Sequence, residues 1–95
     1  MARGNLSLTS TEASVGTSTL ALALNWKREY ALFVNDSDVV IYLMFGAAAE
    51  ANKGVRLDAS GGSYEMTREY GNLDCRAVYA IAASGTGKNL LVAEG

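Results

Sequence analysis

The chain has 95 residues, of which 49% are hydrophobic and 19% charged, and its formal net charge is −2. This composition excludes a disordered chain, and the length fits one small domain. The chain has no excess of basic residues, which nucleic-acid binding usually needs to neutralise phosphates, so we expect no nucleic-acid partner.

The first 24 residues are the least regular part of the sequence. Residues 1–5 are followed by no apolar block of the kind that a secretory signal needs, so no signal peptide is predicted. The segments 6–9 and 20–24 alternate weakly and are predicted as strands. Residues 1–24 are therefore interpreted either as strands of the domain or as a partly extended arm that reaches a neighbour.

The clearest predicted strands follow next. Residues 30–34 and 39–45 are rich in β-branched and aromatic residues and flank four turn-forming residues at 35–38, so we expect a hairpin. Residues 39–45 are apolar at nearly every position. A strand tolerates this only when an opposing sheet covers one face and a neighbour covers the other, so this segment is predicted as a central strand.

The middle of the chain predicts shorter elements. Residues 47–51 are alanine-rich, but the segment 52–54 ends them well before a stable helix length, so a loop is expected. Residues 55–57 are predicted as a short strand. A further strand is predicted at 64–68, in which Tyr64 and Met66 face inward and Glu65 faces outward.

The last part of the chain predicts two more strands. Residues 75–83 form an apolar strand that begins at Cys75, which we expect to be an inert core thiol. The glycine-bearing segment 84–89 leads into a final strand at 90–93, giving a second hairpin. About eight short strands at intervals of roughly 8–12 residues predict an all-β fold, an antiparallel β-sandwich or barrel-like domain, with residues 1–95 as a single domain.

Residue types that support catalysis are scarce. The sequence contains no histidine, which excludes Ser–His or Cys–His activation within one chain, and the single cysteine indicates a reducing compartment. Residues 85–88 look like the end of a phosphate-binding loop, but the required first glycine and the following hydroxyl residue are missing. Residues 35–38 lack the glycine and glutamate of a calcium loop.

Both of these segments are predicted as plain turns, and we expect no enzyme activity, no catalytic residues, no metal site and no cofactor. The longest apolar stretches fall far short of the roughly 20 residues that span a bilayer, so no membrane partner is expected.

Aromatic and cationic residues gather between positions 26 and 30, a composition favoured at protein interfaces. The candidate contact residues are Leu6, Leu8, Trp26, Lys27, Arg28 and Tyr30. Packing along a strand edge, with the charged ends reaching solvent, would leave the same sequence pattern, so both interpretations stay open here.

Six stretches of the sequence are familiar in combination: REYALFVNDS at 28–37, IYLMFG at 41–46, NKGVRL at 52–57, GGSYEM at 61–66, AVYAIAASG at 77–85 and LVAEG at 91–95. Together they resemble small virion proteins encoded by tailed bacteriophages, over roughly residues 25–95. The resemblance implies a β-sandwich module without enzymatic activity. Such modules serve as capsid decoration (cement) proteins or as small head–tail or fibre-associated components.

On this resemblance we expect a capsid decoration protein that binds the major capsid protein or other virion proteins and stabilises the assembled head. We expect it to be a homo-oligomer, located in the virion after synthesis in the bacterial cytoplasm. One alternative is a tail or fibre-associated receptor-binding module that recognises its target through loops such as 47–53. The other is a carbohydrate-binding β-sandwich, with Trp26 or Tyr70 stacking on a sugar.

Overall fold

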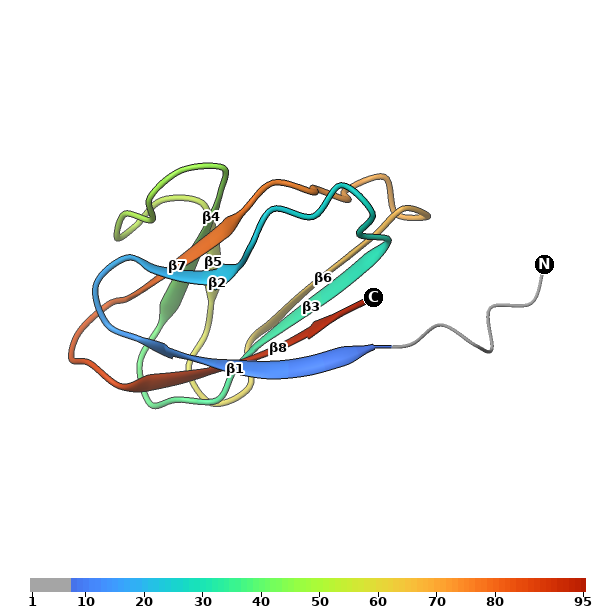
Figure 1. Cartoon of the computed structure of the whole chain (residues 1–95). Coiled ribbons are helices and arrows are strands. Elements are labelled where there is room, and N and C mark those ends of the chain that lie inside the picture. Colours follow the sequence, from blue (N-terminus) through green and yellow to red (C-terminus); the bar gives the residue numbers. More distant parts are fainter. Residues whose placement is uncertain (1–7) are drawn as a thin grey trace.

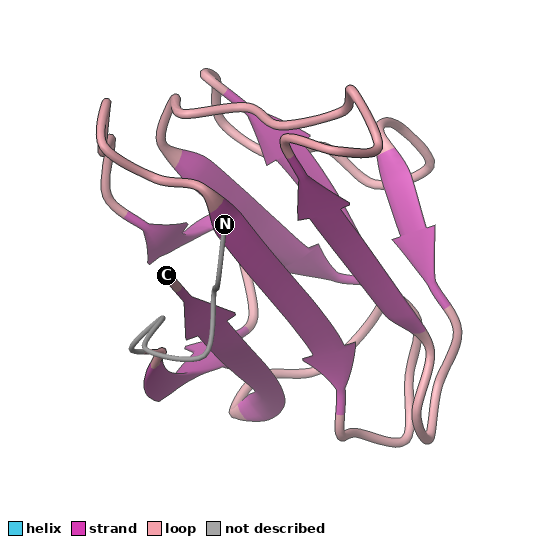
Figure 2. Cartoon of the chain, turned by 90° about the vertical axis from the view of Figure 1, so that its right-hand side faces the viewer, coloured by secondary structure: helices cyan, strands magenta, loops and turns pink. Residues whose placement is uncertain are grey.

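A computed structural model describes residues 8–95 of the chain. Its regular elements are strands, namely β1 (Thr9–Val15), β2 (Thr19–Leu22), β3 (Tyr30–Asn35), β4 (Ile41–Phe45), β5 (Val55–Leu57), β6 (Ser63–Thr67), β7 (Val78–Ala82) and β8 (Lys88–Glu94). Figure 2 shows these strands joined by loops and turns, without a helix among residues 8–95. The same range accordingly contains no helix able to cross a membrane.

The strands form two antiparallel sheets of four strands each (Figure 1). The first sheet has the order β1-β8-β3-β6, and the second has the order β2-β7-β4-β5. The predicted all-β fold with eight short strands is therefore confirmed, and its two layers make it a β-sandwich. The predicted central position of the 39–45 segment is also confirmed, because β4 lies between β7 and β5.

Side chains that alternate along each strand meet between the two sheets and form the core. Its largest apolar members are fully buried, and they come from both sheets: Val15, Phe33, Met66 and Leu90 from the first, and Ile41, Leu43, Leu57 and Val78 from the second. Each such side chain contributes roughly 1.5–3 kcal/mol by leaving water. Tyr64 and Met66 point inward and Glu65 points outward, as predicted.

Both predicted hairpins are wrong. β3 and β4 belong to different sheets, and so do β7 and β8, so the turns between them carry the chain across the sandwich. The reason is visible at Asn35, whose buried amide donates hydrogen bonds to the carbonyls of Val39 (2.7 Å) and Leu57 (3.1 Å). These bonds tie the end of β3 to the opposite sheet, and nothing in the turn sequence separates such a crossing from a hairpin.

Two further predictions are corrected. Of the strand predicted at 6–9, residues 6 and 7 lie outside the described residues and Leu8 precedes the strand: β1 begins at Thr9 and continues through a serine- and threonine-rich stretch to Val15, pairing with β8 along its whole length. Because β1 is an edge strand and mostly exposed, it does not need the apolar pattern that marks a core strand. Cys75 lies in the β6–β7 connection, half-buried, with its Sγ 3.7 Å from the Arg28 carbonyl, rather than in a strand.

One end of the sandwich is closed by Arg28, whose side chain is fully buried. Its guanidinium donates to Glu94 Oε2 (2.7 Å) and to the carbonyls of Asp74 (2.7 Å), Arg76 (3.0 Å) and Ala23 (2.7 Å). These partners belong to β8, to the β6–β7 connection and to the β2–β3 connection. The single side chain therefore fastens three segments that are distant in sequence.

Replacing Arg28 with methionine should lower the free energy of unfolding by about 3–5 kcal/mol, because the carboxylate of Glu94 would lose its buried cationic partner. Lysine should recover only part of the loss, since an ammonium group cannot reproduce the planar fork of donors. Urea unfolding of the variants measures both effects. The control is Arg56→Met, which removes an exposed pair with Asp58 and should cost about 0–1 kcal/mol; equal losses at the two arginines would contradict the assignment.

Candidate protein-binding surfaces

The predicted turn at 35–38 borders a shallow hollow of about 480 Å³, which it forms with Ser60 and Gly61. The Asp38 carboxylate accepts a hydrogen bond from Lys88 Nζ at 2.8 Å, and this lysine lowers the pKa of Asp38. Asp36 accepts a weaker bond from the amide of Asn89. Among residues 8–95, no three His, Cys, Asp or Glu side chains gather as they would around a metal ion.

Strands β2, β7 and β4 carry contiguous apolar side chains on the outward side of the second sheet, and the exposed Arg56 of β5 borders them beside Tyr42. We call this apolar surface the tyrosine face and define it as Leu20, Tyr42, Met44, Tyr79 and Ile81. Tyr79 lies between Leu20 on β2 and Met44 on β4, and Ile81 lies beside Tyr42. Leu20 is 49% exposed and the other four are partly exposed. An apolar patch of this kind on a surface is typical of a site for a partner.

The outward side of the first sheet carries a second apolar surface. We call it the groove face and define it as Leu32, Val34, Leu91 and Ala93. These residues line a groove of about 260 Å³ over β3 and β8, bordered by Ser10 of β1. The carboxylates of this side lie at its margins, with Glu12 of β1 beside Leu91 and Glu65 of β6 beside Leu32.

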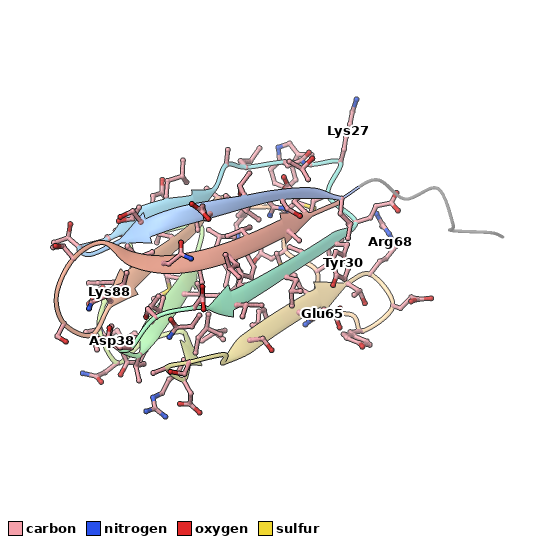
Figure 3. All side chains as sticks on the ribbon, turned by 90° about the horizontal axis from the view of Figure 1, so that it is seen from below. Lys27, Tyr30, Asp38, Glu65, Arg68 and Lys88 are labelled. Atoms are coloured by element: carbon pink, nitrogen blue, oxygen red, sulfur yellow. The ribbon has the colours of Figure 1, made fainter. Side chains whose placement is uncertain are left out.

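The predicted contact residues are distributed over different environments. Leu6 lies outside the described residues, and Leu8 is 49% exposed just before β1. Trp26 is 72% exposed in the β2–β3 connection, and the neighbouring Lys27 is exposed too and projects from the end of the sandwich (Figure 3). Tyr70, the other candidate for sugar stacking, is 67% exposed at the same end.

Two of the predicted contact residues have structural roles instead. The prediction of Arg28 as a contact residue is wrong, because its side chain has no exposed surface and its guanidinium bonds to Glu94 and to three backbone carbonyls of its own chain. Tyr30 is half-buried, and its hydroxyl donates a 2.6 Å hydrogen bond to Glu65 Oε2 on the neighbouring strand β6 (Figure 3). The four contact residues predicted in this segment are thus split between two that face outward and two that hold the fold.

These surfaces are identified by the positions and exposure of their side chains. Comparison with family models, curated proteins and solved structures gave no match. The tyrosine face and the groove face are candidate binding surfaces that residue-by-residue reasoning missed. A signal was present, because the nearly continuous apolar runs in 39–45 and 75–83 indicate strands covered on both sides, whereas the chain itself covers only the inner side of β4 and β7.

The hydrogen bond to Glu65 raises the pKa of Tyr30 to about 12, with a further contribution from burial. Since the phenol has a pKa near 10 when unfolded, the folded state favours the neutral form. Its stabilising contribution is therefore complete below about pH 10 and is lost as the pH rises through about 12.

We expect the free energy of unfolding to fall over this alkaline range in the wild type, and the fall to be smaller in Tyr30→Phe. Urea unfolding at a series of pH values measures the difference. As a second readout, phenolate absorbance should show late titration of Tyr30 and Tyr70, because Glu65 raises the pKa of both; this titration should shift to lower pH in Glu65→Gln, and the part that belongs to Tyr30 should be absent in Tyr30→Phe. An unchanged titration in Glu65→Gln would show that the hydrogen bond does not set this pKa.

Proposed function

We propose that the protein is a non-enzymatic structural component of a bacteriophage particle, most concretely a capsid decoration protein that binds and stabilises the assembled head. The observation that carries the proposal is the tyrosine face. Five apolar side chains, including two tyrosines and a methionine, form rows across β2, β7 and β4 on the side away from the core. Aromatic and methionine side chains are enriched where protein interfaces are fully buried.

The resemblance to small virion proteins supplies the kind of partner. A protein that binds capsid subunits only in their assembled arrangement stabilises that arrangement in proportion to the logarithm of its saturation. No chemistry is needed for this role, and rigid surfaces are sufficient. In the proposed arrangement the tyrosine face lies against the capsid, which gives β4 and β7 the second cover that their sequences indicate.

The proposal also includes the location and the assembly state. The protein would be made in the bacterial cytoplasm and retained in the virion, with several copies arranged around a symmetry axis of the head. An oligomer that binds several capsid subunits at once does not require a strong single contact, because its first contact holds its other copies at high effective concentration near their sites.

Purified protein should cosediment with heads assembled from the major capsid protein of its source phage, saturate at a simple ratio to capsid subunits and raise the temperature at which heads disrupt. Tyr79→Lys should weaken binding by roughly thirtyfold, which corresponds to about 2 kcal/mol for a central interface residue. Ser84→Lys introduces the same charge at an exposed residue outside the tyrosine face and should bind as the wild type does.

Both variants are first checked by urea unfolding, so that a loss of binding is not a loss of fold. Saturable binding that Tyr79→Lys leaves unchanged would reject the tyrosine face as the contact. Absence of saturable binding by the wild-type protein would reject decoration and favour the tail or fibre-associated alternative.

A further inference from the structure

The β2–β3 connection presents a tip made of Trp26 and Lys27. Among the described residues, Trp26 is the most exposed large apolar side chain, at 72%. Lys27 is exposed beside it and makes no ion pair within residues 8–95. Tryptophan is among the residues that most often dominate binding energy at protein interfaces, and the neighbouring unpaired cation can add electrostatic complementarity at the rim.

The tip is held in place before any partner arrives. The backbone amide of Lys27 donates to Asn25 Oδ1 at 3.0 Å, and that of Arg28 donates to the Asn25 carbonyl at 3.1 Å. The buried guanidinium of Arg28 anchors the connection directly behind the two outward residues. A partner would therefore lose little conformational freedom in ordering this segment.

The groove face has the size, the apolar floor and the acidic margin that would fit Trp26 and Lys27. Its volume of about 260 Å³ lies just below the range of roughly 300–1,000 Å³ typical of small-molecule sites, so it suits one large side chain better than a free ligand. Its floor is apolar, formed by Leu32, Val34, Leu91 and Ala93. Glu12 lies beside Leu91 at the margin, exposed and without an ion pair within the described part of the chain.

We propose that Trp26 of one copy of the chain occupies the groove face of a second copy, with Lys27 placed opposite Glu12. The apolar ring would cover the apolar floor, and the two unpaired opposite charges would meet at its margin. The exposure of Trp26 shows that it does not occupy the groove of its own chain. This contact between copies stands independently of capsid binding, because it uses neither the tyrosine face nor a capsid subunit.

The contact joins two different surfaces, so each copy can give its tip to one neighbour and its groove to another. Repetition of such a contact closes into a ring when the rotation allows and otherwise continues as an open chain. An interface anchored by one aromatic side chain lies at the small end of protein interfaces. Self-association should accordingly be weak, dependent on protein concentration and reduced by salt.

The first test uses Trp26 as a probe, because it is the only tryptophan in the sequence. In the full chain, its fluorescence emission should shift to shorter wavelength as the protein concentration rises, in step with larger species in analytical ultracentrifugation. Salt should reverse both changes. Emission and mass that stay constant up to millimolar protein would overturn the proposal.

The second test blocks the two surfaces separately. Leu91→Lys closes the groove and keeps the tip, whereas Trp26→Ala removes the tip and keeps the groove, so neither variant should self-associate. Mixed together, they should form a one-to-one complex and nothing larger, and the emission of the Leu91→Lys chain should shift. Leu20→Lys, which places the same charge on the tyrosine face, should associate as the wild type does.

A third test exchanges the two charges, because recovery in a double variant cannot be explained by poor folding of the single variants. Glu12→Lys and Lys27→Glu should each weaken self-association by about tenfold, and the double variant should recover it. Recovery would support the direct pairing, and a double variant weaker than either single one would overturn it. Self-association that persists in Leu91→Lys alone would show that Trp26 binds elsewhere, while the capsid experiment would be unaffected.

Discussion

A buried guanidinium group organises one end of this sandwich. A charge at the depth of Arg28 would cost several kcal/mol if it were left alone, so the surrounding structure has to supply a carboxylate and well-placed acceptors. Glu94 supplies the carboxylate and three backbone carbonyls supply the rest. Among the described residues, no buried side-chain polar atom is without a hydrogen-bond partner. The connections at this end are therefore fixed as tightly as the strands.

The buried position of Arg28 also determines where the side chains of its neighbours lie. Because its side chain points inward, Trp26 and Lys27 lie on the outside of the same short connection and form a tip that is rigid at its base. At the other end Asn35 has a comparable role, since its amide joins the β3–β4 connection to the carbonyl of Leu57. Polar side chains at both ends thus hold crossings between sheets that the apolar core alone would not specify.

A sandwich of this length has a single core layer, and each sheet has one face that its own chain does not cover. In many proteins such faces are polar, but here both carry contiguous apolar side chains. For an isolated protein these surfaces are unfavourable in water, whereas in an assembly they become contact area. The proposed role in an assembly would account for both faces at once: in that proposal the tyrosine face contacts a shell of other subunits, and the groove face receives the tip of a neighbouring copy.

The sequence by itself determined the all-β class, the number of strands and the positions of most of them, because alternation of apolar residues and turn chemistry are local properties. It also indicated that the 39–45 segment needs cover on two sides. Only the tertiary structure decided that β3–β4 and β7–β8 are crossings, because a hairpin and a crossing share the same turn residues. Only the tertiary structure showed that Arg28 is buried whereas Trp26 and Lys27 are exposed. It also brought Leu32, Val34, Leu91 and Ala93 together in one groove. Burial and juxtaposition depend on contacts between residues far apart in the chain, and no local pattern records them.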